Sequence, residues 1–373
     1  MMSFQILGLG TALPEHSISQ QGAATFATTA VAQESVDSGN IPALIQALYR
    51  RAGVQSRHSV LLETSSDEEA TAERFYRAAQ NSGDRGPRTA ERMLRYEHDA
   101  PRLVSVAAAR ALTDARTDPQ QITHLVTVSC SGFSAPGVDL SLIEKLGLNR
   151  TVARTHVGFM GCHGALNGLR VARAIALSEP DAVVMICAVE LCSLHHQYGW
   201  DPQKIVANSL FADGAAVVIG RGSRERPVTE VAFPGGVVGN YSFVIPDTAD
   251  MMTWRIGDHG FEMTLSPAVP GIITRELPHA LEQFLGRFNL RISDIRSWAI
   301  HPGGPRILAA TAEAAGLADA QMEPSVSILQ RCGNMSSPTV LFILEELRRR
   351  EMQTPCIMLG FGPGLNVEIA LLQ

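Results

Sequence analysis

The sequence predicts an α/β protein built from two similar halves, and three observations support this. A short apolar stretch ending in a polar, Gly-containing turn occurs in each half, and each is followed by a Gly-led helix start and a second apolar stretch. The intervals agree, because Ser129 and Cys162 are 33 residues apart and so are His301 and Asn334. The apolar runs are continuous, as expected of strands that are buried on both faces by helices.

The first half carries its elements in the order strand, helix, strand. HLVTVSCSG, around Ser129, predicts a strand that ends in a turn. GCHGALNGLRVARAIA, from Cys162, predicts a helix with an apolar face, and AVVMICAVE predicts the next strand. The amino-terminal stretch MMSFQILGLGTALPE has no basic residues before its apolar run, so it predicts another strand and not a secretion signal.

The second half repeats this order. SWAIHPGG, around His301, predicts a strand and turn, GNMSSPTVLFILEEL predicts a helix from Asn334, and CIMLGFGPG predicts a strand. The seam between the halves is expected in RGSRERPV, residues 221–228, which divides the chain into residues 1–222 and 223–373. Two such halves would share one cleft, and residues 63–100 are expected to cover it with helices and loops.

Composition argues against several classes of function. Apolar residues make up 45% and charged residues 18% of the chain, which is typical of a globular enzyme. The net charge of −6 gives no reason to expect a nucleic-acid partner. No stretch approaches the roughly 20 apolar residues that a membrane-spanning helix needs, so a cytoplasmic protein without a membrane partner is expected. The six cysteines lack disulfide spacing, and the Cys192, His195 and His196 cluster has no partner cluster, so no metal is expected.

Cys162 is the candidate nucleophile. A cysteine among apolar residues is most often structural, but Cys162 follows Gly161 and opens a long helix. The positive end of a helix and its unpaired N–H groups stabilise a thiolate. With an imidazole in reach, the pKa of a thiol can fall to about 3.5–7.5. We therefore expect a reactive thiolate that accepts acyl groups from thioesters.

His301 and Asn334 are its expected partners. A structural histidine and an ordinary helix N-cap are the simpler interpretations, but the repeat places both residues beside the cleft with Cys162. Decarboxylation of a malonyl thioester produces an enolate, which imidazole and carboxamide N–H groups stabilise without adding a competing base. The enolate carbon then attacks the acyl group on Cys162, whose thiolate His301 would hold as an ion pair.

Five linked motifs follow one another from Leu210 to Glu368: LFADGAA, VPGII, IHPGGPRIL, GNMSSPTVLFILEE and GFGPGLNVE. Together they resemble the type III polyketide synthases, the chalcone-synthase-like branch of the thiolase superfamily. The resemblance implies a thiolase-like, duplicated αβαβα layered fold with two mixed five-stranded sheets, a homodimer, and a catalytic triad of Cys162, His301 and Asn334. It also implies that malonyl-CoA extends an acyl-CoA starter repeatedly, with no metal, carrier protein or other cofactor.

The same resemblance assigns the substrate cavity. Phe211, in LFADGAA, is the implied gate between the CoA tunnel and the cavity, and Met263 replaces a second Phe gate of plant chalcone synthases. The GFGPG loop, with Gly362, helps to shape the cavity. Plant cavity-lining Thr positions and their small polar neighbours correspond here to Cys130, Ser131, Cys192, His195 and Ser336. The candidate CoA-binding residues at the tunnel mouth are Arg50, Arg51, Arg57 and Arg306.

The residues leave alternatives open. A β-ketoacyl-ACP synthase III-like enzyme shares the triad, but it takes malonyl units from a carrier protein and condenses once. A thiolase would need a second catalytic cysteine, and the late Cys356 lies within an apolar stretch. A non-catalytic relative predicts a broken triad, whereas all three positions are intact. The sequence names neither the starter nor the ring closure, so pyrone, resorcinol and phloroglucinol-type products are all expected classes.

Overall fold

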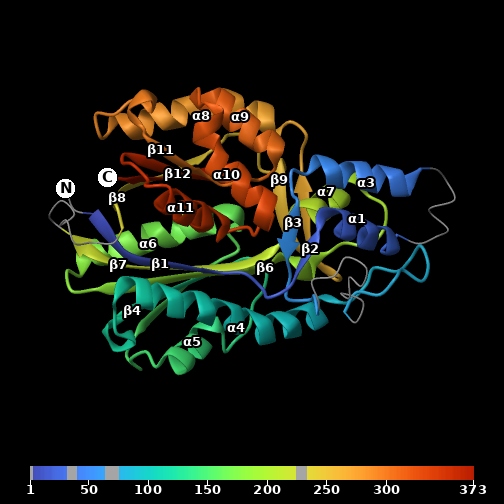
Figure 1. Cartoon of the computed structure of the whole chain (residues 1–373), viewed down its shortest axis with the longest axis horizontal. Coiled ribbons are helices and arrows are strands. Elements are labelled where there is room, and N and C mark those ends of the chain that lie inside the picture. Colours follow the sequence, from blue (N-terminus) through green and yellow to red (C-terminus); the bar gives the residue numbers. More distant parts are fainter. Residues whose placement is uncertain (1–2, 32–39, 64–74, 224–232) are drawn as a thin grey trace.

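Helices and β-sheets alternate in five layers (Figure 1). The computed structural model describes all residues except 1–2, 32–39, 64–74 and 224–232. The predicted layered αβαβα arrangement is confirmed. Within the described residues no helix is long and apolar enough to cross a membrane.

The sheet of the first half has five strands. In spatial order these are β5 (Ala153–Gly158), β4 (His124–Ser129), β6 (Val183–Leu191), β7 (Asp213–Ser223) and β1 (Ser3–Ala12). β4 is parallel to both β5 and β6, whereas β7 is antiparallel to β6 and to β1. The strands are almost wholly buried except β5, whose residues are mostly exposed at the end of the sheet.

The sheet of the second half follows the same plan. Its strands are β11 (Ser297–Ile300), β12 (Cys356–Gly362), β13 (Asn366–Leu372) and β8 (Gly236–Val244). β11 is parallel to β12, whereas β13 is antiparallel to β12 and to β8. β11, β12, β13 and β8 therefore correspond to β4, β6, β7 and β1, and the internal repeat seen in the sequence is a repeat of structure.

The expectation of two separate five-stranded sheets is wrong in detail. The second half contributes four strands to the large sheet among the described residues, because α10 (Asp319–Cys332), which follows α9 (Pro305–Ala315), occupies the place before Asn334 that β5 occupies before Cys162. In addition, β1 pairs with β8 at Phe4 and Gln5, which joins both sheets into one nine-stranded sheet.

Helices fill the other three layers. α4 (Thr89–Ala115) and α5 (Val138–Leu146) cover the outer face of the first sheet, and α8 (Val269–Gly286) and α9 cover that of the second (Figure 1). α6 (Gly164–Ser178), α10 and α11 (Thr339–Arg349) lie between the sheets. α6 approaches β4 closely because Gly168 leaves no side chain between them. Leu166, Leu169, Leu341 and Leu344 belong to the core that this middle layer forms with both sheets.

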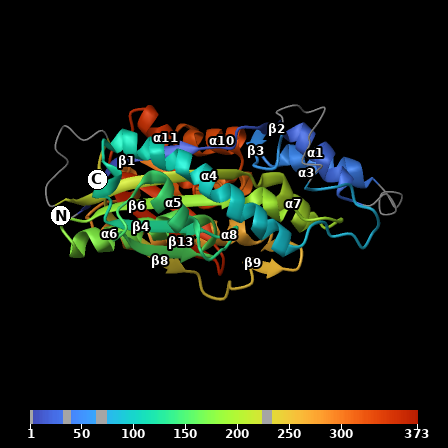
Figure 2. The ribbon, with the colours of Figure 1, turned by 90° about the horizontal axis from the view of Figure 1, so that it is seen from below.

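A smaller group of elements lies at one end of the molecule, opposite both termini (Figure 2). It consists of α1 (Gln20–Thr29), α3 (Ile41–Arg51), α7 (Pro202–Leu210) and two small two-stranded sheets, β2 (Ser17–Ser19) with β3 (Ser56–His58) and the hairpin of β9 (Met252–Gly257) with β10 (Gly260–Leu265). Four 3-10 helices complete the described elements: η2 (Pro119–Gln121), η3 (Gly161–His163), η4 (Cys192–His195) and η5 (Ile292–Asp294).

Two sequence-based expectations reach into undescribed residues. In the seam expected at residues 221–228, residues 221–223 end β7 and the remainder lies outside the described part of the chain. In the segment 63–100, residues 64–74 also lie outside it, residues 75–88 form loops and turns, and α4 begins at Thr89. Tyr76 in this segment contributes to the pocket described below.

Candidate active site

The three predicted catalytic residues lie at matching places in the two halves. Cys162 is in η3, which leads into α6. His301 directly follows β11, and Asn334 lies in the turn between α10 and α11. Gly161 and Gly333 precede the cysteine and the asparagine with φ angles of +75° and +72°, a conformation that side chains other than glycine rarely adopt. These glycines let the chain turn sharply just before each functional side chain.

The Cys162 thiol lies close enough to two side chains from the other half, the Ser336 hydroxyl and the Asn334 carboxamide, for both to favour its charged form. The Ser336 Oγ also lies 3.4 Å from the Sγ of Cys130. The Ser336 N–H donates to Asn334 Oδ1 at 2.8 Å, which fixes the orientation of the carboxamide. Cys162 is half-buried, whereas the other five cysteines are buried. The fold thus gathers both halves around a single accessible thiol.

The His301 imidazole is buried, with 1% of the residue exposed. Its backbone N–H donates to Leu359 O at 2.8 Å, which holds the residue at the end of β11. Neither ring nitrogen has a hydrogen-bond partner among the described residues. Burial lowers the pKa of His301 to about 3, and the neighbouring His163 lowers it further. His301 is therefore neutral at physiological pH, with both ring nitrogens free of protein partners.

Burial works against the predicted thiolate. Burial raises the pKa of Cys162 to about 11, and the charge of Glu190 adds to this shift, while the hydrogen bonds with Ser336 and Asn334 oppose it. The predicted ion pair with His301 is not formed, because the imidazole makes no hydrogen bond to the thiol. The cost of removing a thiolate from water outweighs the stabilisation by the helix terminus here. A buried charge loses more hydration free energy than a few aligned N–H groups supply.

A buried carboxylate that the sequence analysis missed lies beside this group. Glu190, near the end of β6, is 0% exposed. Its oxygens accept hydrogen bonds from the hydroxyls of Ser131 and Ser337, both at 2.6 Å, and from the backbone N–H groups of Cys130 and Ser131 at 2.9–3.1 Å. Burial raises its pKa, and these hydrogen bonds oppose the rise. The signal was present in the sequence, since Glu190 is the one charged residue in the run AVVMICAVEL.

A second missed network supports the helix that follows Cys162. The Nδ1–H of His163 donates to Asn167 Oδ1 at 2.7 Å, and Asn167 Nδ2 donates to the buried Glu368 carboxylate at 2.9 Å. Asn366 also donates to Glu368, at 3.1 Å, and Arg170 lies 3.4 Å from it. Burial lowers the pKa of His163, while the hydrogen bond with Asn167 and the charge of Glu368 oppose that shift.

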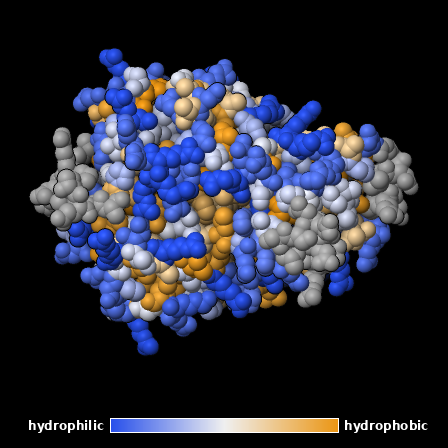
Figure 3. Space-filling view, in the orientation of Figure 1, coloured by the Kyte–Doolittle hydropathy of each residue, from blue (hydrophilic) through white to orange (hydrophobic). Residues whose placement is uncertain are grey.

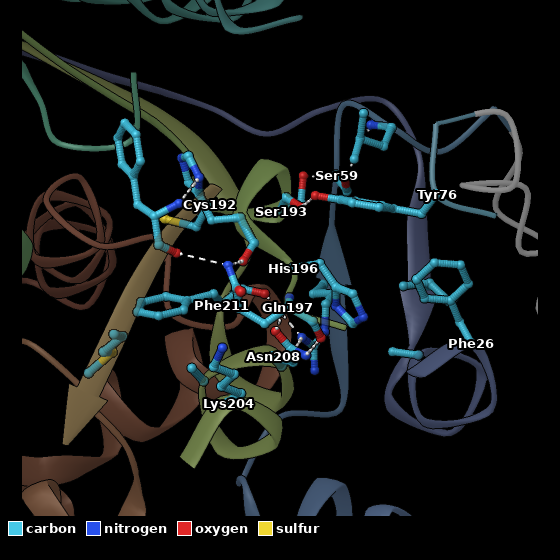
Figure 4. A pocket seen from close by; sticks show the side chains of 18 of the residues that line it. Phe26, Ser59, Tyr76, Cys192, Ser193, His196, Gln197, Lys204, Asn208 and Phe211 are labelled. Carbon is cyan, nitrogen blue, oxygen red and sulfur yellow. Dashed lines mark hydrogen bonds between the residues drawn. The ribbon is translucent and has the colours of Figure 1, made fainter. Parts of the chain in front are cut away.

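A pocket lies next to these residues, between the small end group and the two sheets. It contains about 820 Å³ of empty space, part of it open to solvent, and four of the predicted cavity residues line it (Figure 4): Phe211, Met263, Cys192 and His195. Most of the remaining lining is apolar or aromatic, and sequence reasoning missed these residues: Ile18, Ala23, Phe26, Tyr49, Leu61, Leu62, Tyr76, Trp254 and Phe261. Phe211 joins the pocket to the predicted catalytic residues, because it lines the pocket and its backbone pairs with Asn334.

Two family models match almost the whole chain. The model described as "Chalcone and stilbene synthases, N-terminal domain" matches residues 3–223, and that described as "Chalcone and stilbene synthases, C-terminal domain" matches residues 237–373. The chain belongs to the chalcone and stilbene synthase family. It is a type III polyketide synthase, a decarboxylating condensing acyltransferase with a thiolase-like fold. This decides against the ketoacyl synthase alternative.

Individual relatives support the same family assignment. The chain is 32% identical over 370 residues to "Alpha-pyrone synthesis polyketide synthase-like Pks18" of Mycobacterium tuberculosis, covering 97% of this chain and 89% of that protein. It is also 32% identical over 371 residues to 1,3,6,8-tetrahydroxynaphthalene synthase of Streptomyces peucetius subsp. caesius, covering 99% and 92%. The crystal structure of PKS-I from the brown alga Ectocarpus siliculosus superposes with a TM-score of 0.87 at 29% identity, covering 100% of this chain and 98% of that one.

Two residues predicted to line the substrate cavity of this polyketide synthase, His195 and Gly362, pack closely against other residues of the protein. His195 donates from Nε2 to Ser131 O at 2.7 Å and accepts at Nδ1 from the Phe261 N–H at 2.9 Å, so both ring nitrogens are used. Burial lowers the pKa of His195 to about 3, and its ring stacks on Phe261. Gly362 is not among the residues that line the pocket; it ends β12 against the imidazole of His163.

The four candidate CoA-binding arginines of this polyketide synthase differ in exposure. Arg50, Arg51 and Arg306 are exposed. Arg57 is buried, and its guanidinium donates to oxygen atoms of the protein, which argues against contact with a CoA phosphate. Sequence reasoning missed Lys204, which lines the pocket and lies 3.4 Å from Glu262. The described residues contain no group of three or more His, Cys, Asp or Glu placed to hold a metal ion.

Proposed function

We propose that this polyketide synthase loads an acyl group from a CoA starter onto Cys162, extends it repeatedly with malonyl-CoA and closes the chain into a ring. Pyrone, resorcinol and phloroglucinol-type products are the expected classes. One observation carries this assignment: Cys162, the one cysteine that is not fully buried, lies beside the Asn334 carboxamide, which comes from the other half of the chain. The two halves, residues 1–222 and 223–373, thus contribute the acyl carrier and the enolate donors respectively.

Loading begins from a neutral thiol and a neutral imidazole. His301 accepts the Cys162 proton as the sulfur attacks the starter thioester, because neither of its ring nitrogens has a partner among the described residues and a neutral imidazole can serve as the base. The new Sγ–acyl bond replaces the bond between the acyl carbon and the CoA sulfur. The departing CoA thiolate takes the proton back from His301, which returns to its neutral form.

Extension uses the same groups in another way. The bond between the malonyl α-carbon and its carboxylate breaks, CO₂ leaves, and the negative charge gathers on the thioester oxygen. Asn334 Oδ1 is held by the Ser336 N–H, so its Nδ2 group is left to donate to that oxygen, together with one N–H of neutral His301. The enolate carbon then attacks the acyl group, and the Cys162 sulfur leaves and is reprotonated.

CoA thioesters are the proposed substrates, and no further cofactor is proposed. The apolar and aromatic side chains that line the pocket behind Phe211 favour an aliphatic acyl group over a highly polar one. Arg50, Arg51 and Arg306 are exposed and are the remaining candidates for contacts with the CoA phosphates. The presence of six free thiols supports the proposal of a reducing, cytoplasmic setting.

A homodimer is proposed as the working form. β5 lies at the end of the nine-stranded sheet with an exposed edge, and such an edge offers unpaired backbone groups to a second chain. Large apolar side chains are exposed nearby on Phe133 and Leu140, at 39% each, and on Val106 of α4, at 46%. Apolar surface is visible over the lower half of the molecule, where α4 and α5 lie (Figure 3). A second copy would cover this surface.

The decisive experiment is product analysis without carrier protein. The purified chain is incubated with malonyl-CoA and a panel of acyl-CoA starters of increasing length, and products are identified by mass spectrometry. The proposal expects pyrones or resorcinols that depend on the starter, and their complete loss in Cys162→Ala. Products that form only when malonyl-ACP replaces malonyl-CoA, or that persist in Cys162→Ala, would reject it.

A further inference from the structure

Arg57, on β3, is a buried cation that has no carboxylate partner among the described residues. Its two Nη atoms make four hydrogen bonds: to Asn208 O at 2.6 Å, to Phe211 O at 3.0 Å, to Ser209 O at 2.6 Å and to Gln20 Oε1. A guanidinium has four N–H groups on these two atoms, so all of them are used within the protein. Only Nε lacks a partner among the described residues, and it is buried. A phosphate would find no free donor pair on this side chain.

Three of the four hydrogen-bond acceptors of Arg57 are backbone carbonyl groups at the end of α7. Asn208 and Ser209 are in the last turn of α7, and Phe211 directly follows that helix. The last carbonyl groups of a helix have no partner within the helix and carry its negative end, so they attract a cation. Gln20, which opens α1, reinforces the same site, since its Nε2 donates to Ser209 O at 3.0 Å.

The segment held by Arg57 is also the segment that fixes Asn334. The Asn334 N–H donates to Leu210 O at 2.8 Å, and Asn334 O accepts from the Ala212 N–H at 2.9 Å. Phe211 therefore lies between the two residues that hold the Asn334 backbone, in an isolated β-bridge. Gly333 makes this possible, because a Cβ at that position would lie 3.0 Å from both Leu210 O and Ala212 Cβ.

We propose that Arg57 is a positioning residue that holds Phe211 and Asn334 as one unit across the two halves of the chain, and that it is not a ligand of CoA. This rests on the roles of Phe211 and Asn334 in the proposed function. The Arg57 guanidinium fixes the carbonyl groups of Asn208, Ser209 and Phe211 by hydrogen bonds. The β-bridge between Phe211 and Asn334 then fixes the backbone of Asn334 relative to the same segment. A displacement of the α7 end then moves the enolate donor and the pocket wall together.

The first test compares Arg57→Lys with the wild type on two malonyl donors, malonyl-CoA and the malonyl thioester of N-acetylcysteamine, which lacks the nucleotide phosphates. Lysine keeps the positive charge but cannot form the four hydrogen bonds of the guanidinium. The expected result is a fall in kcat of about 10²-fold on both donors, since small displacements of positioned groups have effects of this size. The KM for malonyl-CoA should change little. A raised KM for malonyl-CoA with unchanged kinetics on the short thioester would overturn the proposal.

A second measurement does not depend on activity. Hydrogen exchange of the backbone N–H groups of Ala212 and Asn334, followed by mass spectrometry, should be faster in Arg57→Lys, while β6 exchanges as in the wild type. Unchanged exchange at both positions would overturn the positioning role even if the protein proved to catalyse another reaction. Conversely, a wild type that makes no product with malonyl-CoA but shows the expected exchange would reject the proposed function alone.

Gln20→Leu provides a milder variant in case Arg57→Lys does not fold. It leaves the charge in place but removes one acceptor of Arg57 and the second donor to Ser209 O. The same changes in kcat and in exchange are expected, at smaller size, and their absence in a folded Gln20→Leu would contradict the proposal. Arg102→Lys, an exposed substitution on α4, is the matched control and should behave as wild type in every measurement.

Discussion

Gly362 lies against the imidazole of His163, so closely that a methyl group at position 362 would overlap the ring at Cδ2 and stand 3.1 Å from Met160 O. The residue that follows the nucleophile and the loop at the end of β12 are thereby fitted to each other. Gly362 is thus needed for close packing against His163.

Gly362→Ala should destabilise the protein. Overpacking of this kind costs about 1–3 kcal/mol in the free energy of unfolding, measured by denaturant titration. The double variant with His163→Ala should lose less than the sum of the two single variants, because the ring that clashes is gone. Gly271→Ala in α8, where a Cβ would meet no atom within 4 Å, is the control and should be neutral or slightly stabilising. Additive losses in the double variant would contradict the packing argument.

Alkylation of Cys162 by iodoacetamide should rise steadily with pH. With a pKa of about 11, the thiolate fraction increases about tenfold per pH unit between pH 7 and 10. Ser336→Ala removes a hydrogen bond that lowers this pKa, so labelling at pH 9 should be slower in that variant. Cys162→Ser identifies the labelled site by mass spectrometry. A labelling rate that is already constant between pH 7 and 8 would mean that the thiolate is stabilised after all.

Glu190→Gln should make Cys162 more reactive while weakening the fold. The Glu190 charge raises the pKa of the thiol, so its removal should speed alkylation at pH 8. The amide also places N–H donors opposite the Cys130 and Ser131 N–H groups, which costs about 1–3 kcal/mol of stability. Glu368→Gln removes a buried carboxylate from the network of His163 and should leave the alkylation rate unchanged. Equal rates in the wild type and Glu190→Gln would disprove the electrostatic coupling.

Asn334→Ala should separate loading from extension. The variant retains the Cys162 thiol, so transfer of a radiolabelled starter from its CoA thioester to the protein should persist. Decarboxylation of malonyl-CoA should fall by about 10²–10³, the usual cost of losing one donor to an oxyanion. Cys162→Ala should show the reverse, with no loading but continued decarboxylation. If Asn334→Ala decarboxylates at the wild-type rate, the carboxamide does not stabilise the enolate.

Mild acid should destabilise the protein. His195, His196 and His301 have pKa values lowered to about 3 by burial, so between pH 6.5 and 3 the unfolded chain binds protons that the folded chain does not. Stability therefore rises with pH in this window and falls as the pH drops, by about 1.4 kcal/mol per pH unit for each such histidine. His301→Gln should reduce the slope of unfolding free energy against pH by about one proton. An unchanged slope would place the His301 pKa near its ordinary value.

The sequence predicted the layers and the catalytic set because both are written locally. The matched spacing of Ser129 with Cys162 and of His301 with Asn334 gave the duplicated α/β plan, and strand ends and helix starts must lie at corresponding places in such a plan. The missing fifth strand of the second half was not predicted, because the stretch that forms β5 before Cys162 forms the helix α10 before Asn334. The pocket walls were found only in part, since α1, α3 and the β9 and β10 hairpin meet there from distant parts of the chain.

By itself, then, the amino-acid sequence determined the α/β class, the repeat and the identity of Cys162, His301 and Asn334 as candidates. Only the tertiary structure decided their charges and neighbours. Whether Arg57 faces solvent or helix carbonyls, and whether Cys162 is a thiol or a thiolate, depends on how much water surrounds each group and on which dipoles replace it. Those quantities arise from contacts between residues more than a hundred positions apart, which no local pattern records.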